Sequence, residues 1–98
     1  MMTDRELLEL AAKAAGVELK YDTFGQSENA DRVYCYWNPL EDDGEALQLA
    51  VQLGFVVEPG KCWHSHYGPV FGEDVLMGVM AATRRAIVRA AAEIGAQM

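Results

Sequence analysis

The dipeptide Pro59-Gly60, with strand-forming residues on both sides, is the feature that most limits how this 98-residue chain can fold. Proline presets the backbone at the first central position of a type II turn, and glycine supplies the positive φ that the second position requires. We therefore expect a β-hairpin over 55–66 in which Glu58 faces Lys61. Two-residue hairpin loops more often use type I′ or II′ turns, so a loop longer than two residues is the alternative.

This pairing decides which side chains share a face of the sheet. Alternate residues of a strand point to opposite faces, and directly paired residues lie on the same face. One face then carries Phe55, Val57, Cys62 and His64, and the other carries Val56 and Trp63. A sheet with apolar residues on both faces needs cover on both sides. We expect an α/β (α+β) fold with a small, largely antiparallel sheet and helices on both faces, an α/β/α sandwich.

Two segments have the apolar spacing and the end signals of amphipathic helices. Thr3 and Glu6 form a capping-box pattern, and Gly16 ends that segment. Asp42 and Gly54 bound the second segment in the same way. The apolar faces predicted for the two helices are Leu7, Leu10, Ala11 and Ala14, and Ala46, Leu49, Ala50 and Leu53.

A third helix is predicted from Asp74 to Gly95, with Gly78 as a point that bends it or delays its beginning. Its apolar stripe consists of Leu76, Met80, Thr83, Ile87, Ala91 and Ile94, widened by Val75, Val79 and Val88. Further strands are expected over 17–22 and 32–37, and 67–72 is expected as a loop. The predicted element order is αββαββα, in one domain over 1–98.

Composition and charge exclude some classes of function. No window is apolar enough for a membrane span, and the charged N-terminal segment does not resemble a signal peptide, so we expect a cytoplasmic protein without membrane contact. In that compartment Cys35 and Cys62 are expected as free thiols. The net charge of −7 repels a nucleic-acid backbone, and we expect no binding to nucleic acid.

Cys62, His64 and His66 follow one another at two-residue spacing, which resembles a set of soft metal ligands. On a strand, however, the backbones of Cys62 and His66 are about 13 Å apart, too far to share one ion. We interpret Cys62 as a buried packing thiol and expect no joint metal site. A metal- or thiol-dependent activity centred on these residues is the alternative function that this stretch leaves open.

Other charged and aromatic groups have simpler interpretations. Arg84, Arg85 and Arg89 form the one basic cluster, a possible interaction surface for phosphate or an acidic partner, although a solvated helix face explains them more simply. The acidic residues at the start of the second helix fit helix capping better than cation binding. These are Glu41, Asp42, Asp43 and Glu45. Core or interface packing is expected for Tyr34, Tyr36, Trp37 and Trp63.

The segment from Trp37 to Gly95 resembles the phage alpha-beta-alpha sandwich domain family, small uncharacterised proteins of tailed phages and prophages. The most specific part is the closing run Ala86, Ile87, Val88, Arg89, Ala90 and Ala91. The resemblance implies the sandwich fold and a phage context, with no catalytic residue or cofactor. We therefore expect a phage or prophage accessory protein in the host cytoplasm that is not an enzyme. It would act through contact with another protein or through self-association.

Overall fold

The computed structural model describes residues 3–17, 37–65 and 69–98. The elements within them are α1 (Asp4–Ala15), α2 (Asp43–Leu53), β1 (Phe55–Glu58), β2 (Lys61–His64), β3 (Phe71–Gly72), the 3-10 helix η1 (Val75–Met77) and α3 (Val79–Ala96). The α+β class is confirmed, with an antiparallel sheet of order β1-β2-β3. The strands expected over 17–22 and 32–37 lie outside the described residues, except for Val17 in the first and Trp37 in the second.

The ends of α1 and α2 are those that the sequence predicts. Thr3 accepts a hydrogen bond from the Glu6 amide at 3.2 Å and completes the capping box, and Asp42 accepts one from the Glu45 amide at 2.8 Å. Gly16 and Gly54 end the helices in the left-handed conformation, with φ of 73° and 76°. These contacts span only a few residues, so neighbouring sequence suffices to specify them.

The hairpin also follows the prediction. Gly60 has φ of 79°, and β1 pairs with β2 through to Glu58 opposite Lys61, so the loop has two residues. The expectation that 67–72 is entirely a loop was wrong at its end, because Phe71–Gly72 forms β3 on the other edge of β2. A strand of two residues shows no alternating pattern, and its pairing with β2 is what defines it.

The third helix begins later than Asp74. Asp74 caps η1 by accepting a hydrogen bond from the Leu76 amide, and Gly78, with φ of 108°, separates η1 from α3. The predicted apolar stripe was wrong over its first turns, because Leu76 and Met80 are exposed. The buried positions of α3 are instead mainly small residues: Ala82, Ala86, Ile87, Val88, Ala90, Ala91, Ala92 and Gly95.

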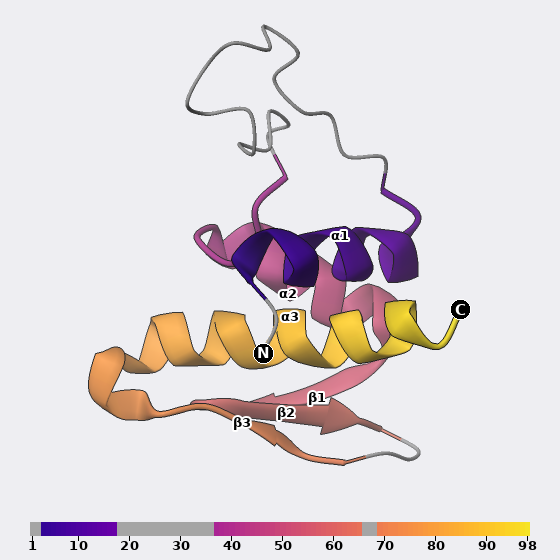
Figure 1. The fold of residues 1–98 in the computed structure, drawn as a ribbon. Helices are drawn as coiled ribbons and strands as arrows, with labels where there is room; N and C mark the ends of the chain where they lie inside the picture. Colours follow the sequence, from indigo (N-terminus) through magenta and orange to yellow (C-terminus); the bar gives the residue numbers. More distant parts are fainter. Residues whose placement is uncertain (1–2, 18–36, 66–68) are drawn as a thin grey trace, which may run out of the picture.

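The layers differ from the expected sandwich in one respect. Figure 1 shows α3 along one face of the sheet and α1 and α2 beyond it, so the described helices all lie on the same side. The other face carries exposed Val56 and half-buried Trp63 beside a Glu58–Lys61 ion pair of 3.2 Å. The sequence predicts a sheet with packing on both of its faces, but it is α3 that is packed on both sides. Its small side chains let it contact the sheet on one side and α1 on the other.

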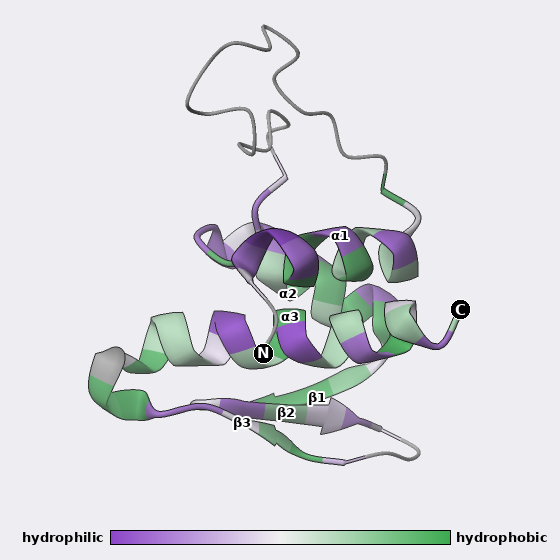
Figure 2. Cartoon of the chain, in the orientation of Figure 1, coloured by the Kyte–Doolittle hydropathy of each residue, from purple (hydrophilic) through white to green (hydrophobic). Residues whose placement is uncertain are grey.

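The core lies between these layers. Figure 2 shows hydrophobic residues of the three helices where the layers meet, and more polar residues toward the outside of α1. The buried core includes Leu7, Leu8, Ala11, Ala46, Leu49, Ala50, Cys62, Ile87 and Val88. Within the described part of the chain, no helix combines the length and the hydropathy needed to cross a membrane.

Candidate functional site

Cys62 is a packing thiol, as predicted. Its side chain is 0% exposed, and its Sγ donates a hydrogen bond to the Ala86 carbonyl of α3 at 3.2 Å. Burial raises the pKa of the thiol from 9.0 to about 12, since the thiolate would lose its hydration. At neutral pH Cys62 is therefore protonated and closed to solvent, which argues against a nucleophilic role.

We expect Cys62 to resist alkylation by iodoacetamide at pH 8 in the folded protein and to react in urea. Because the folded state favours the protonated thiol, the contribution of Cys62 to the free energy of unfolding is fully present below pH 9. It is lost as the pH rises from about 9 toward 12. Peptide mass spectrometry separates Cys62 from Cys35 and supplies the readout. Rapid labelling of Cys62 without denaturant would contradict its burial.

His64 lies on the same face of the sheet as Cys62, but it is only half-buried. Its ring contacts Phe55 edge-on, with centroids 6.3 Å apart and an angle of 81° between the planes. His66 and Cys35 lie outside the described residues. Over residues 3–17, 37–65 and 69–98, no three His, Cys, Asp or Glu side chains are grouped in a way that could hold a metal ion.

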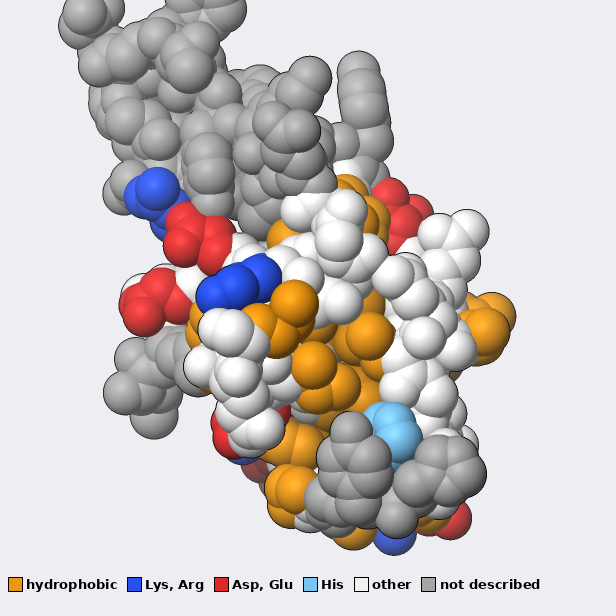
Figure 3. Space-filling model, turned by 90° about the vertical axis from the view of Figure 1, so that its right-hand side faces the viewer, with side chains coloured by type: hydrophobic (Ala, Val, Ile, Leu, Met, Phe, Trp, Pro, Cys, Tyr) orange, Lys and Arg blue, Asp and Glu red, His pale blue; other side chains and the backbone are white. Residues whose placement is uncertain are grey.

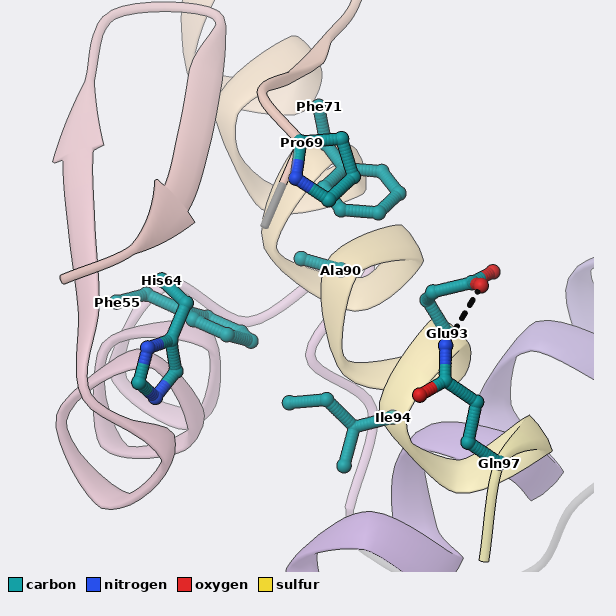
Figure 4. Close-up of a pocket in the computed structure, with 8 residues that line it drawn as sticks. All are labelled: Phe55, His64, Pro69, Phe71, Ala90, Glu93, Ile94 and Gln97. Atoms are coloured by element: carbon teal, nitrogen blue, oxygen red, sulfur yellow. Dashed lines mark hydrogen bonds between the residues drawn. The ribbon is translucent and has the colours of Figure 1, made fainter. Parts of the chain in front are cut away.

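An apolar cleft opens between the sheet and the C-terminal half of α3. Its volume is about 140 Å³, and it is lined by Phe55, His64, Pro69, Phe71, Ala90, Glu93, Ile94 and Gln97. Figure 4 shows Phe55 and His64 on the sheet side facing Ala90 and Ile94 on the helix. Figure 3 shows the same end of the molecule, where hydrophobic side chains surround a hollow beside the histidine.

The polar groups of the cleft lie at its edge. The Gln97 amide donates a hydrogen bond to the exposed Glu93 carboxylate at 3.1 Å, and His64 borders the sheet side. An apolar cavity of about 150 Å³ is large enough for a benzene-sized group. The cleft can therefore hold a phenyl ring or a branched aliphatic side chain, with hydrogen-bonding groups around the opening.

The three arginines of α3 are engaged within the molecule. Arg84 donates to the Asp43 carboxylate at 2.7 Å and to the Leu40 carbonyl at 2.8 Å. Arg85 pairs with Asp4 at 2.8 Å. Arg89 pairs with Glu73 at 2.7 Å and lies 5.9 Å from the centre of the Phe71 ring. These ion pairs connect α3 to α2, to α1 and to the segment after β3, so phosphate would have to compete with carboxylates already in place.

The remaining candidates are structural where the structure describes them. Asp42 caps α2, and Glu45 accepts a hydrogen bond from the Asn38 amide, in agreement with the capping interpretation. Trp37 packs against the core, and Trp63 lies half-buried on the outer face of the sheet. Tyr34 and Tyr36 lie outside the described residues.

The sequence pointed to only part of the cleft. His64 was placed on the correct face by the hairpin register, and Phe55 with it. The sequence predicts Phe71 in a loop, and Ile94 only as part of the apolar stripe of a helix. An aromatic residue two positions after Pro69 was the available signal for a short packed strand, but a single residue carries little pattern.

Comparison with protein-family models, with curated proteins and with solved structures found no match to this chain.

Proposed function

We propose that this chain is a non-catalytic binding domain that acts through contact with another protein, and that the cleft receives one apolar side chain of that partner. The observation that carries the proposal is the cleft itself, a hollow with apolar walls between β-sheet and α3 and with polar groups at its edge. Protein interfaces typically have an apolar centre in which an aromatic or aliphatic anchor fills a pocket, inside a polar rim.

The residues around the cleft fit this role. Pro69 lines it, and the neighbouring Val70 is exposed, so apolar surface continues beyond the opening. Gln97 and Glu93 can form hydrogen bonds with a partner's backbone without entering the hollow. The resemblance of residues 37–95 to the phage sandwich-domain family adds a setting: an accessory protein in the cytoplasm of an infected bacterium.

Replacing Ala90 with leucine tests the proposal, because the larger side chain would project into the cleft and occupy it. Ala90 is 2% exposed, so we expect A90L to be less stable but folded, and to lose at least about tenfold in affinity for the partner. The control is A96L, which adds the same side chain at an exposed position of the same helix. Tagged wild-type, A90L and A96L proteins are compared by capture from lysates of infected bacteria, and affinity for the captured protein is then measured with purified components.

Circular dichroism first establishes that A90L is folded. If it is not, Ile94→Ala replaces it, since loss of that wall removes contacts with the anchor without adding volume. Equal affinity of the cleft variant and A96L for the same partner would disprove the role of the cleft. A concentration-dependent dimer that A90L abolishes, seen by analytical ultracentrifugation, would identify the partner as a second copy.

A further inference from the structure

A second apolar surface lies at the opposite end of α3. A groove of about 140 Å³ between α2 and the first turns of α3 is lined by Asp43, Ala46, Leu47, Val57, Met80, Thr83, Arg84 and Ile87. Of these, Leu47 is 62% exposed and Met80 is 57% exposed. Leu76 in η1 is 91% exposed, and Val75 and Val79 are exposed as well. Figure 2 shows hydrophobic colouring where η1 connects the sheet to α3.

The hairpin turn lies between the groove and η1 and contacts both. The Gly60 amide of the hairpin turn donates a hydrogen bond to the Thr83 hydroxyl at 2.7 Å, and Thr83 lines the groove. Val75 lies against the same turn, so closely that a Cβ on Gly60 would be 2.6 Å from its Cγ1. Val75 and the groove residue Thr83 therefore both adjoin the hairpin turn. We call the exposed apolar residues on either side of this turn the α2–η1 surface: Leu47, Val57, Val75, Leu76, Val79 and Met80.

The charges around this surface are predominantly negative. Arg84 lines the groove, and it is already paired with Asp43 at 2.7 Å. Asp42 and Asp74 add further carboxylates next to the groove and to Val75, where they cap α2 and η1. A partner with positive charge beside its apolar residues would be attracted, which favours both its encounter rate and its orientation.

The negative charge around the α2–η1 surface favours some binding partners over others. A second copy of the chain would place the same carboxylates near one another, and nucleic acid or an anionic lipid surface would be repelled. We propose that the α2–η1 surface binds a basic amphipathic helix of a partner protein. Apolar residues at three- and four-residue spacing would enter the groove, and flanking Lys or Arg would face Asp42 and Asp74. This proposal does not depend on the cleft, which lies at the other end of α3.

Synthetic helical peptides test the proposal directly. One fluorescein-labelled peptide of about 18 residues, or five turns, carries leucine on one face and lysine elsewhere. A second replaces lysine with glutamate, and a third scrambles the leucine/lysine sequence. By fluorescence anisotropy at physiological salt, we expect the leucine/lysine helix to bind at least about tenfold more tightly than either control.

Variants of the protein locate the binding. The double variant L76S/M80S should weaken binding of the leucine/lysine helix at least about tenfold, whereas V70S, an equivalent change at an exposed residue near the cleft, should not. The altered side chains are exposed, so the fold should be kept, and circular dichroism checks this.

Equal or tighter binding of the glutamate peptide would overturn the proposal, as would binding that L76S/M80S leaves unchanged. A dimer in analytical ultracentrifugation that L76S/M80S dissociates would assign the surface to a second copy and overturn it too. None of these results affects the proposed role of the cleft, which is tested by A90L.

Discussion

Replacing Gly95 with alanine is expected to lower the free energy of unfolding by at least about 2 kcal/mol. Gly95 is buried where α3 meets α1, and a Cβ there would overlap the Leu10 carbonyl oxygen and lie 2.7 Å from its carbonyl carbon. These are backbone atoms, so no side-chain rotation relieves the overlap and α1 itself must shift. Alanine gains about 1 kcal/mol in helix propensity, which offsets only part of the cost.

The matched control is Gly72→Ala, because a Cβ at Gly72 would have no atom within 4 Å and its φ is not in the left-handed range. Urea unfolding followed by circular dichroism at 222 nm compares the two variants with the wild type. If G95A and G72A unfold at the same urea concentration, the close approach of α1 and α3 is not as described.

Replacing Leu49 with alanine is expected to lower the free energy of unfolding by about 3 kcal/mol. Leu49 is 2% exposed in the core, and its removal loses apolar burial and leaves a cavity that packed neighbours fill only partly. Domains of this kind are stable by about 5–15 kcal/mol, so the loss is a large share of the total.

The control for this variant is Leu47→Ala on the exposed side of the same helix, expected to change stability by less than about 0.5 kcal/mol. The same urea measurement gives both values. A cost at Leu47 equal to that at Leu49 would contradict the orientation of α2, since only one of the two faces the core.

The candidate cleft could be predicted only in part. The hairpin register places Phe55, Cys62 and His64 on one face, because pairing partners and alternation follow from the position of the turn. The opposite wall comes from Ala90 and Ile94, far along the chain in α3. No local pattern indicates which part of a helix will lie over which part of a sheet.

The arginine contacts show the same limit. A basic cluster is visible in the sequence, but Asp4 and Arg85 are 81 residues apart and Arg84 and Asp43 are 41 residues apart. These residues come into contact only when α1 and α2 pack on α3. The prediction of a solvated helix face therefore could not anticipate which carboxylate each guanidinium would meet.

The sequence by itself determined the features that depend on neighbouring residues. The capping box at Thr3 and the Asp42 cap need side chains and amides three positions apart, and the left-handed glycines Gly16, Gly54 and Gly60 end helices or form the turn. In each case the interacting groups are a few bonds apart, so little chain entropy opposes them and the local pattern is sufficient.

Only the tertiary structure decided how the layers are stacked. The apolar spacing of α3 suggested a single stripe through Leu76 and Met80, yet those residues are exposed and the alanines and Gly95 are buried. Small side chains contribute little apolar area individually, but they allow α1 to approach the backbone of α3 while the sheet packs on its other side. The packing of α3 against α1 on one side and the sheet on the other depends on how the shapes of these separate elements fit together. The hydrophobic periodicity of α3 alone does not encode that fit.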